Sequence, residues 1–192
     1  MKRAIFLDRD GVLNKLVFNL ATGEYESPNR VEDLAIYPYV AESLGRLQQK
    51  GYLLFLVSNQ PSYAKGKTNL ENILAVHEEM HRYMGENSIM FSEYFYCYHH
   101  PQGIVPTYSF TCPCRKPKPF FLKKAKKKYN LDMGNSWLIG DQDTDVFCGQ
   151  AGGVKTILLA NEHSKNKRKE SCPDYQADNL LMAVELLLKL SR

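Results

Sequence analysis

Short apolar runs that alternate with helical patterns are the feature of this chain that most constrains its fold. Five runs rich in branched and aromatic residues each predict a buried strand, at residues 4–7, 52–57, 94–96, 136–139 and 154–159. One helical pattern opens at Pro38 and ends at Gly51, another follows Thr68 as its cap, and two more cover residues 120–129 and 177–190. This alternation predicts an α/β fold with a parallel sheet between helices, whose sites lie beyond the carboxyl ends of the strands.

The length and apolar content fit one folded unit. The 192 residues are 44% hydrophobic and contain no long linker, so we expect a single domain over residues 1–192. The first apolar run is too short for a signal peptide, and no later run approaches the roughly 20 residues that span a bilayer. We therefore expect a cytoplasmic monomer without a membrane partner. The net charge of +4 is mild, and the basic runs at 123–128 and 165–169 suit an anionic substrate without requiring nucleic acid.

Two carboxylates follow the first predicted strand. Asp8 and Asp10 flank Arg9, and Gly11 comes next. Because Asp and Gly are common in turns, a polar turn is the plain interpretation of these residues alone. The same spacing can also place one carboxylate on a metal ion and the other over a bound substrate.

Polar residues follow the second strand and precede the third helix. Ser58, Asn59 and Gln60 supply a hydroxyl and amides that suit phosphoryl oxygens, although such residues also form turns. Arg115 and Lys116 lie just before the predicted helix at residue 120. A fixed ammonium there is either a surface charge or a device that neutralises a transferring phosphoryl group.

Acidic residues follow the fourth predicted strand. Asp141, Asp143 and Asp145 come directly after Gly140. They are suited to capping the next helix, whose positive dipole end favours carboxylates. Magnesium also prefers hard oxygen ligands, so Asp141 beside Asp8 would complete the protein's share of a magnesium site.

Three cysteines and a histidine form two tight pairs between the second polar cluster, at residues 58–60, and the third, which begins at Arg115. Cys97 and His99 are followed, after twelve residues, by Cys112 and Cys114. Buried free cysteines are the alternative, but three thiolates and an imidazole suit a closed tetrahedral zinc site better. His100 is a competing ligand on spacing alone.

Together the four polar clusters resemble the motifs of the haloacid dehalogenase (HAD) superfamily, in the same order along the chain. The matches are Asp-x-Asp-Gly at residue 8, Ser58, Lys116, and Gly-Asp-x-x-x-Asp at residue 140. The resemblance implies a Rossmann-like core and a magnesium-dependent phosphatase. Asp8 would attack phosphorus and form an aspartyl-phosphate, while Asp10 would act as acid and base.

The remaining roles are also implied by this resemblance. Ser58, Asn59 and Lys116 would hold the phosphoryl oxygens together with Mg²⁺. Asp8, Asp141 and the backbone carbonyl of Asp10 would bind that ion.

The cysteine loop points to a narrower family. Cys-x-His-His-Pro-Gln-Gly followed by Cys-x-Cys-Arg-Lys-Pro resembles the histidinol-phosphate phosphatase and D,D-heptose 1,7-bisphosphate phosphatase family. This resemblance implies a core with no large cap domain and a zinc loop at 97–114, with Zn²⁺ held by His99, rather than His100, and the three cysteines. It also implies that Arg115, with Asn59 and Gln60, contacts a small phosphorylated substrate.

The twelve residues between His99 and Cys112 resemble the loop of the heptose branch of this family. This resemblance implies removal of the 7-phosphate of D-glycero-D-manno-heptose 1,7-bisphosphate or a related sugar phosphate. Such a reaction belongs to carbohydrate metabolism, for example the synthesis of lipopolysaccharide or capsule precursors. Some residues depart from that branch: Lys65 stands where Arg is expected, and Gln142 replaces a Lys. Residues 61–66 differ from the usual glycine-containing segment of that branch, and residues 15–28 are longer and less recognisable than expected. Histidinol-phosphate phosphatase is the alternative enzyme, and a zinc-dependent nucleic-acid-binding module is the alternative from another class.

Overall fold

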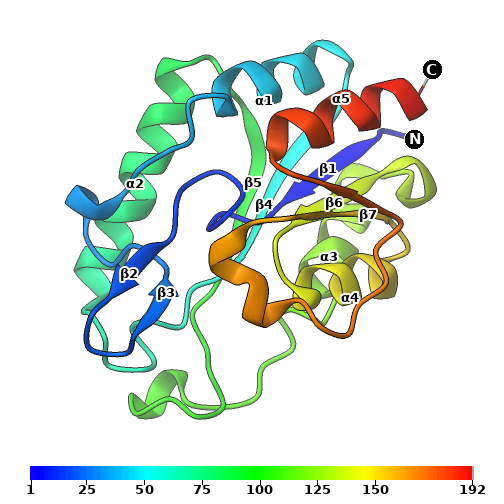
Figure 1. Ribbon diagram of the computed structural model, residues 1–192. Coiled ribbons are helices and arrows are strands. Elements are labelled where there is room, and N and C mark those ends of the chain that lie inside the picture. The colour runs from blue at the N-terminus through cyan, green and yellow to red at the C-terminus, as the bar shows by residue number, and fades with distance from the viewer. Residues whose placement is uncertain (192) are drawn as a thin grey trace.

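Six parallel strands form one sheet, in the order β5-β4-β1-β6-β7-β8. The computed structural model describes residues 1–191, and Figure 1 shows the sheet crossing the middle of the molecule. The strands are β1 (Ala4–Leu7), β4 (Leu53–Asn59), β5 (Phe91–Cys97), β6 (Trp137–Gly140), β7 (Lys155–Leu159) and β8 (Tyr175–Ala177). β1 lies between β4 and β6, so the carboxyl ends of three neighbouring strands meet at the centre of one sheet edge.

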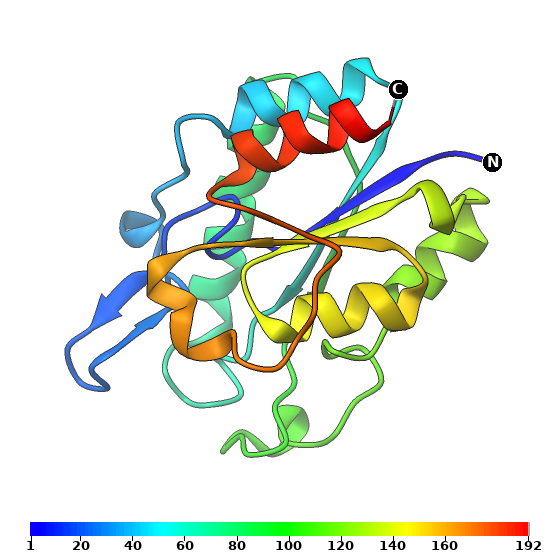
Figure 2. The ribbon, with the colours of Figure 1, turned by 45° about the vertical axis from the view of Figure 1, so that its right-hand side comes forward.

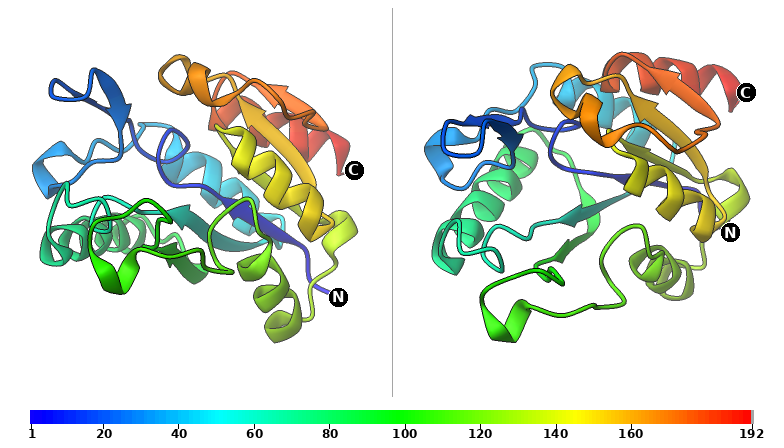
Figure 3. Two further views of the ribbon diagram at one scale, coloured as in Figure 1. Left: turned by 90° about the horizontal axis from the view of Figure 1, so that it is seen from below. Right: turned by 60° about the horizontal axis from the view of Figure 1, so that its bottom comes forward.

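Helices cover both faces of the sheet. They are α1 (Val40–Gln49), α2 (Leu70–Glu86), α3 (Phe120–Tyr129), α4 (Asp143–Gly152) and α5 (Leu180–Leu190). Side chains alternate along β1, so Ile5 and Leu7 pack in a core with residues of α1, α2 and α5, whereas Phe6 packs in a second core with residues of α3 and α4. Figures 2 and 3 show α1 beside α5, with α3 and α4 across the sheet from them. The predicted α/β layering is confirmed.

Two predicted helix starts are wrong by a few residues. The last helix begins at Leu180 rather than at residue 177, because Tyr175–Ala177 pairs with β7 as a strand and the Asn179 side chain caps the helix by accepting a hydrogen bond from Met182 N. The cap of α2 is Asn69, which accepts from the backbone N–H of Asn72, and not Thr68.

The insertions into this core are small. A hairpin of β2 (Val17–Asn19) and β3 (Glu24–Glu26) lies between β1 and α1, in the segment that sequence patterns left unassigned. A loop between β5 and α3 carries Cys112 and Cys114 and begins just after Cys97, the last residue of β5. Short 3-10 turns occupy Val31–Asp33, Pro106–Tyr108, Met133–Asn135 and Glu162–Lys167, the last called η4. Residues 1–191 hold no large cap domain, and no helix among them has the length and apolar content to cross a membrane.

Candidate active site and metal centre

Three acidic side chains meet at the carboxyl edge of the sheet. Asp8 follows β1, Asp141 follows β6, and Asp145 lies in the first turn of α4. One carboxylate oxygen of each lies within 4.8 Å of the others. Both oxygens of Asp141 are buried without a hydrogen-bond partner. Burial, together with the charges of Asp8 and Asp145, raises the pKa of Asp141 well above its ordinary value. A bound cation would stabilise the ionised form of such a buried carboxylate, which has no hydrogen-bond partner and lies beside two other carboxylates.

Lys116 joins two of these carboxylates. Its ammonium lies 2.9 Å from Asp8 Oδ1 and 2.6 Å from Asp145 Oδ1, and it donates to the Val57 carbonyl at 2.7 Å. Burial alone would lower the pKa of Lys116, but Asp145 and Asp8 raise it above its ordinary value. The amine therefore stays charged and fixed beside Asp8, at the place where a phosphoryl group would approach.

Two glycines allow the carboxylates to approach the backbone this closely. A Cβ atom at Gly11 would lie 2.1 Å from Asp141 Oδ2, and Gly11 also has a φ of +79°, which side chains disfavour. A Cβ atom at Gly140 would lie 2.2 Å from the Cβ of Asp145. Both positions in the sequence motifs therefore require glycine for steric reasons.

Asp10 lies beside Asp8 and is the most heavily hydrogen-bonded carboxylate of the site. Its oxygens accept from Arg9 Nε at 3.0 Å, Asn14 Nδ2 at 3.0 Å, Ser27 Oγ at 2.8 Å and Gln60 Nε2 at 2.6 Å. Burial alone would raise the pKa of Asp10, but Arg9 and these donors hold it below its ordinary value. In this arrangement Asp10 is ionised.

At the end of β4, Asn59 holds the backbone of Lys116, whereas Gln60 holds the side chain of Asp10. The Asn59 side chain accepts from Lys116 N at 3.0 Å and donates to Lys116 O at 3.2 Å, so it fixes the backbone that carries the ammonium. Gln60 is buried behind Asp10, where it also donates to Ser58 Oγ at 2.9 Å. Asn59 lines the pocket, whereas Gln60 and Ser58 lie outside the set of side chains that form its wall.

A pocket of about 210 Å³ opens over these groups. Asp8, Asp10 and Lys116 line it, and Arg115 contributes from the cysteine loop. Ligand pockets for drug-sized molecules span roughly 300–1,000 Å³, so this cavity fits a small ligand.

Sequence reasoning did not single out several side chains of this pocket, among them Ser27 and Lys167. Ser27 comes from the chain that follows the hairpin, and Lys167 comes from η4. No local pattern marks Ser27, and Lys167 belongs to the basic run at residues 165–169, which suits an anionic substrate but was not assigned to a site. Asp145 was matched to a motif, but its ion pair with Lys116 was not foreseen.

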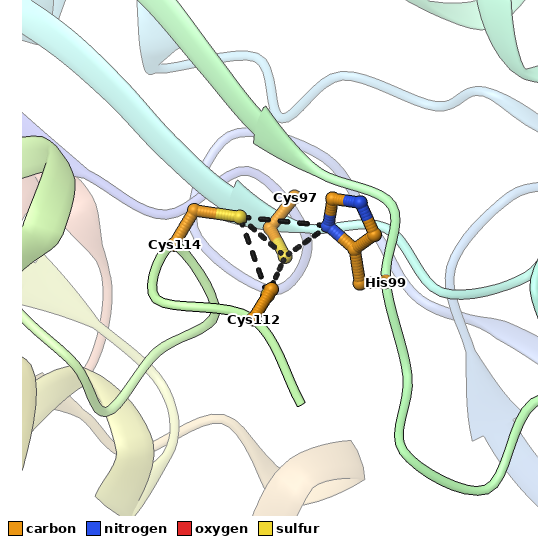
Figure 4. Close-up of side chains that lie close together, drawn as sticks. All are labelled: Cys97, His99, Cys112 and Cys114. Carbon is orange, nitrogen blue, oxygen red and sulfur yellow. Dashed lines mark hydrogen bonds between the residues drawn. The ribbon is translucent and has the colours of Figure 1, made fainter. Parts of the chain in front are cut away.

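The predicted cysteine and histidine cluster is assembled as a tetrad (Figure 4). The three sulfur atoms lie 3.3–3.5 Å apart, and His99 Nδ1 lies 3.5 Å from Cys114 Sγ and 3.8 Å from Cys97 Sγ. Ligands of a tetrahedral zinc ion with Zn–S bonds near 2.3 Å are about 3.7 Å apart, which agrees with this spacing. His100 instead accepts a hydrogen bond from Gln102 N. His99, and not His100, is therefore the histidine that lies in the tetrad.

The tetrad lies next to the segment that carries Arg115 and Lys116 to the pocket. Cys97 is the last residue of β5, and Cys114 directly precedes Arg115. Arg115 is half-buried and donates to the carbonyl of His99 at 3.3 Å. A metal in the tetrad would therefore fix both Arg115 and the following Lys116.

Comparisons with known proteins agree with this arrangement. The HAD-hydrolase-like family profile matches residues 113–183. A D-glycero-beta-D-manno-heptose-1,7-bisphosphate 7-phosphatase of Vibrio cholerae is 35% identical over 158 residues, which cover 82% of this chain and 81% of the relative. The enzyme of the same name from Haemophilus influenzae is 30% identical, with full coverage of both chains.

A D-glycero-alpha-D-manno-heptose-1,7-bisphosphate 7-phosphatase of Photorhabdus laumondii is 30% identical, covering 88% of each chain. Among solved structures, the D,D-heptose 1,7-bisphosphate phosphatase of B. bronchiseptica, in complex with magnesium and phosphate, has the same fold, with a TM-score of 0.79, 23% identity and 99% coverage of both chains. The chain described here therefore belongs to the heptose-1,7-bisphosphate phosphatase family of HAD-type phosphatases.

Proposed function

We propose that this enzyme removes the 7-phosphate from D-glycero-D-manno-heptose 1,7-bisphosphate or a closely similar sugar bisphosphate. The observation that carries the proposal is the surroundings of Asp8 at the floor of the pocket, where Asp8 pairs with the charged Lys116 and has an oxygen within 4.8 Å of the unpartnered carboxylate of Asp141. A nucleophile, a fixed cation and an unsatisfied metal ligand are the groups that phosphoryl transfer needs. The names of the similar enzymes supply the sugar.

Asp8 is the proposed nucleophile. One of its oxygens forms a bond to phosphorus while the bond from phosphorus to the sugar oxygen breaks, which leaves an aspartyl-phosphate. Water then attacks phosphorus, releases inorganic phosphate and restores the Asp8 carboxylate. Lys116 stays beside Asp8 and stabilises the negative charge on the phosphoryl oxygens.

Asp10 is the proposed acid and base. It gives a proton to the departing sugar oxygen and then takes one from the attacking water. The resting carboxylate is ionised, which suits the second step. A dianionic phosphate arriving beside Asp10 raises its proton affinity, since a like charge disfavours the ionised form, and this prepares the first step.

The acidic residues fit a magnesium ion. Asp8 and Asp141 supply hard oxygen ligands, and the bare oxygens of Asp141 are otherwise unexplained in a buried site. The Asp10 carbonyl is the proposed third protein ligand. When bound, the ion would neutralise charge on the phosphoryl group.

The tetrad fits a structural zinc ion. Four protein ligands, the three cysteines and His99, leave no open position for water, so zinc would take no part in bond breaking. Its role would be to hold Arg115 against the pocket, where the planar guanidinium can bind an anionic part of the substrate that is not being hydrolysed.

Phosphate release tests the proposal. Purified protein with Mg²⁺ is compared on heptose 1,7-bisphosphate, histidinol phosphate and an aryl phosphate, with Asp8→Asn as the inactive control. We expect the highest kcat/KM on the heptose bisphosphate and no release by Asp8→Asn. A preference for histidinol phosphate would assign the chain to the other branch, and an inactive protein would refute the phosphatase assignment.

A further inference from the structure

Three cations gather at the rim of the pocket from three different segments. Lys65 lies in the turn after β4, Arg115 in the cysteine loop, and Lys167 at the end of η4. All three line the same pocket. They are distant in sequence, so their convergence is a product of the fold.

These three cations have no acidic partner. Among residues 1–191, no carboxylate lies within 4.0 Å of the side-chain nitrogens of Lys65, Arg115 or Lys167. The neighbouring Lys67, in contrast, forms an ion pair with Glu26. Burial and the charges of Lys67, Arg115 and Lys167 lower the pKa of Lys65, and Glu26, which pairs with Lys67, offsets only part of this effect. Like charges held together without a directly paired carboxylate favour a bound anion.

The surrounding structure holds Lys167 over the pocket. His163, near the start of η4, stacks on Tyr25 of the hairpin with ring centroids 3.8 Å apart. Arg168, the next residue, donates to the carbonyl groups of Leu159 at 3.2 Å and of Asn161 at 2.8 Å. η4 is thus fixed at both ends, and the position of Lys167 follows from packing rather than from a free loop.

The floor of the pocket has the opposite character. Asp8 and Asp10 occupy it, and the ammonium of Lys116 is already paired with Asp8 and Asp145. A substrate with two anionic groups therefore has a distinct place for each: the reacting phosphate at the floor and the other group at the rim.

We propose that Lys65 and Lys167 determine substrate specificity by binding, together with Arg115, a second phosphate that the enzyme does not hydrolyse. This assignment rests on the proposed function, because it assumes that the reacting phosphate lies at Asp8. It also excludes cationic substrates: histidinol phosphate carries a protonated amine, which these three side chains repel.

The test uses Lys65→Met and Lys167→Met, with Lys165→Met as the matched control. Lys165 is exposed on the same η4 segment but does not line the pocket. Each variant is assayed on a sugar bisphosphate, the corresponding monophosphate that keeps only the reacting phosphate, and histidinol phosphate. Loss of one charge-assisted contact should lower kcat/KM on the bisphosphate roughly tenfold and leave the monophosphate nearly unchanged.

We expect the effect to appear in KM rather than in kcat and to weaken at high salt, because Lys65 and Lys167 are exposed. Activity on histidinol phosphate should stay level or rise in both variants. Equal losses on bisphosphate and monophosphate, or a loss of the same size in Lys165→Met, would overturn the proposal.

The same assay separates this inference from the proposed function. If wild-type protein hydrolyses monophosphates without favouring a second phosphate, the rim is no subsite, although the phosphatase assignment stands. If another bisphosphate is preferred over the heptose compound and that preference disappears in the two variants, the subsite is supported and the sugar assignment falls.

Discussion

At the scale of single residues, Asp141 and Asp10 should differ in what they contribute to magnesium binding. Substituting a residue that only contacts a metal ligand typically weakens metal binding roughly 10- to 100-fold. Asp141→Asn removes a charged ligand itself, so it should weaken magnesium binding by at least that factor. Asp10→Asn keeps the backbone carbonyl and should bind magnesium nearly as well as wild type. Its turnover should nevertheless fall by roughly 10²- to 10⁴-fold. Calorimetric titration with Mg²⁺ and steady-state kinetics measure the two effects.

Glu162→Gln is the control for this comparison, because Glu162 is an exposed acid on η4. It should leave both quantities unchanged. Equal losses of magnesium affinity in Asp10→Asn and Asp141→Asn would show that the proposed division of roles is wrong.

Asn59 should act on turnover through Lys116. Its amide holds both the N–H and the carbonyl of Lys116, and each such bond contributes about 0.5–1.5 kcal/mol. Asn59→Ala should therefore lower kcat more than it raises KM. Asn59→Asp keeps the acceptor for Lys116 N and should lie between wild type and Asn59→Ala. An effect confined to KM would instead indicate that the Asn59 side-chain amide binds the substrate directly.

At the scale of elements, the cysteine loop should depend on zinc. Cys112→Ser removes one ligand of the tetrad and should destabilise the protein by about 3–5 kcal/mol, in the upper range for single substitutions. Denaturant unfolding and elemental analysis measure the loss of stability and of zinc. Cys172→Ser, at an exposed cysteine outside the tetrad, should change neither. If the Cys112→Ser protein lacked zinc but kept wild-type stability and activity, zinc would have no structural role.

Buried helices and strands could be predicted from the sequence, whereas short and partly exposed strands could not. The central strands and α3 were predicted because continuous apolar runs and helical spacing mark them in the sequence. The hairpin and β8 were missed, since strands of three partly exposed residues carry no periodic signal. The structure places motif residues at strand ends as expected. Ser27 and Lys167 reach the pocket only through the folding of distant segments, which no local pattern records.

At the scale of the whole molecule, magnesium should stabilise the fold more strongly as pH rises. The pKa of Asp141 lies well above its ordinary value, and burial raises the pKa of Asp145 to about 6. At these two carboxylates the folded state therefore holds more protons than the unfolded chain. Their contribution to metal-free stability should fall as pH increases from about 4 through these folded-state pKa values, by up to about 1.4 kcal/mol per pH unit for each group.

Magnesium binds the ionised carboxylate, so it offsets this loss, and its stabilising effect grows with its affinity. Thermal unfolding between pH 5 and pH 8, with and without Mg²⁺, measures the difference. Asp141→Asn removes the uncompensated charge and should raise metal-free stability at pH 8 while abolishing the gain from magnesium. If the magnesium-dependent shift in Tm were the same at both pH values, Asp141 would not be the linked group. If Asp141→Asn lost stability equally at pH 5 and pH 8, its carboxylate would be satisfied in the folded protein even without a metal ion.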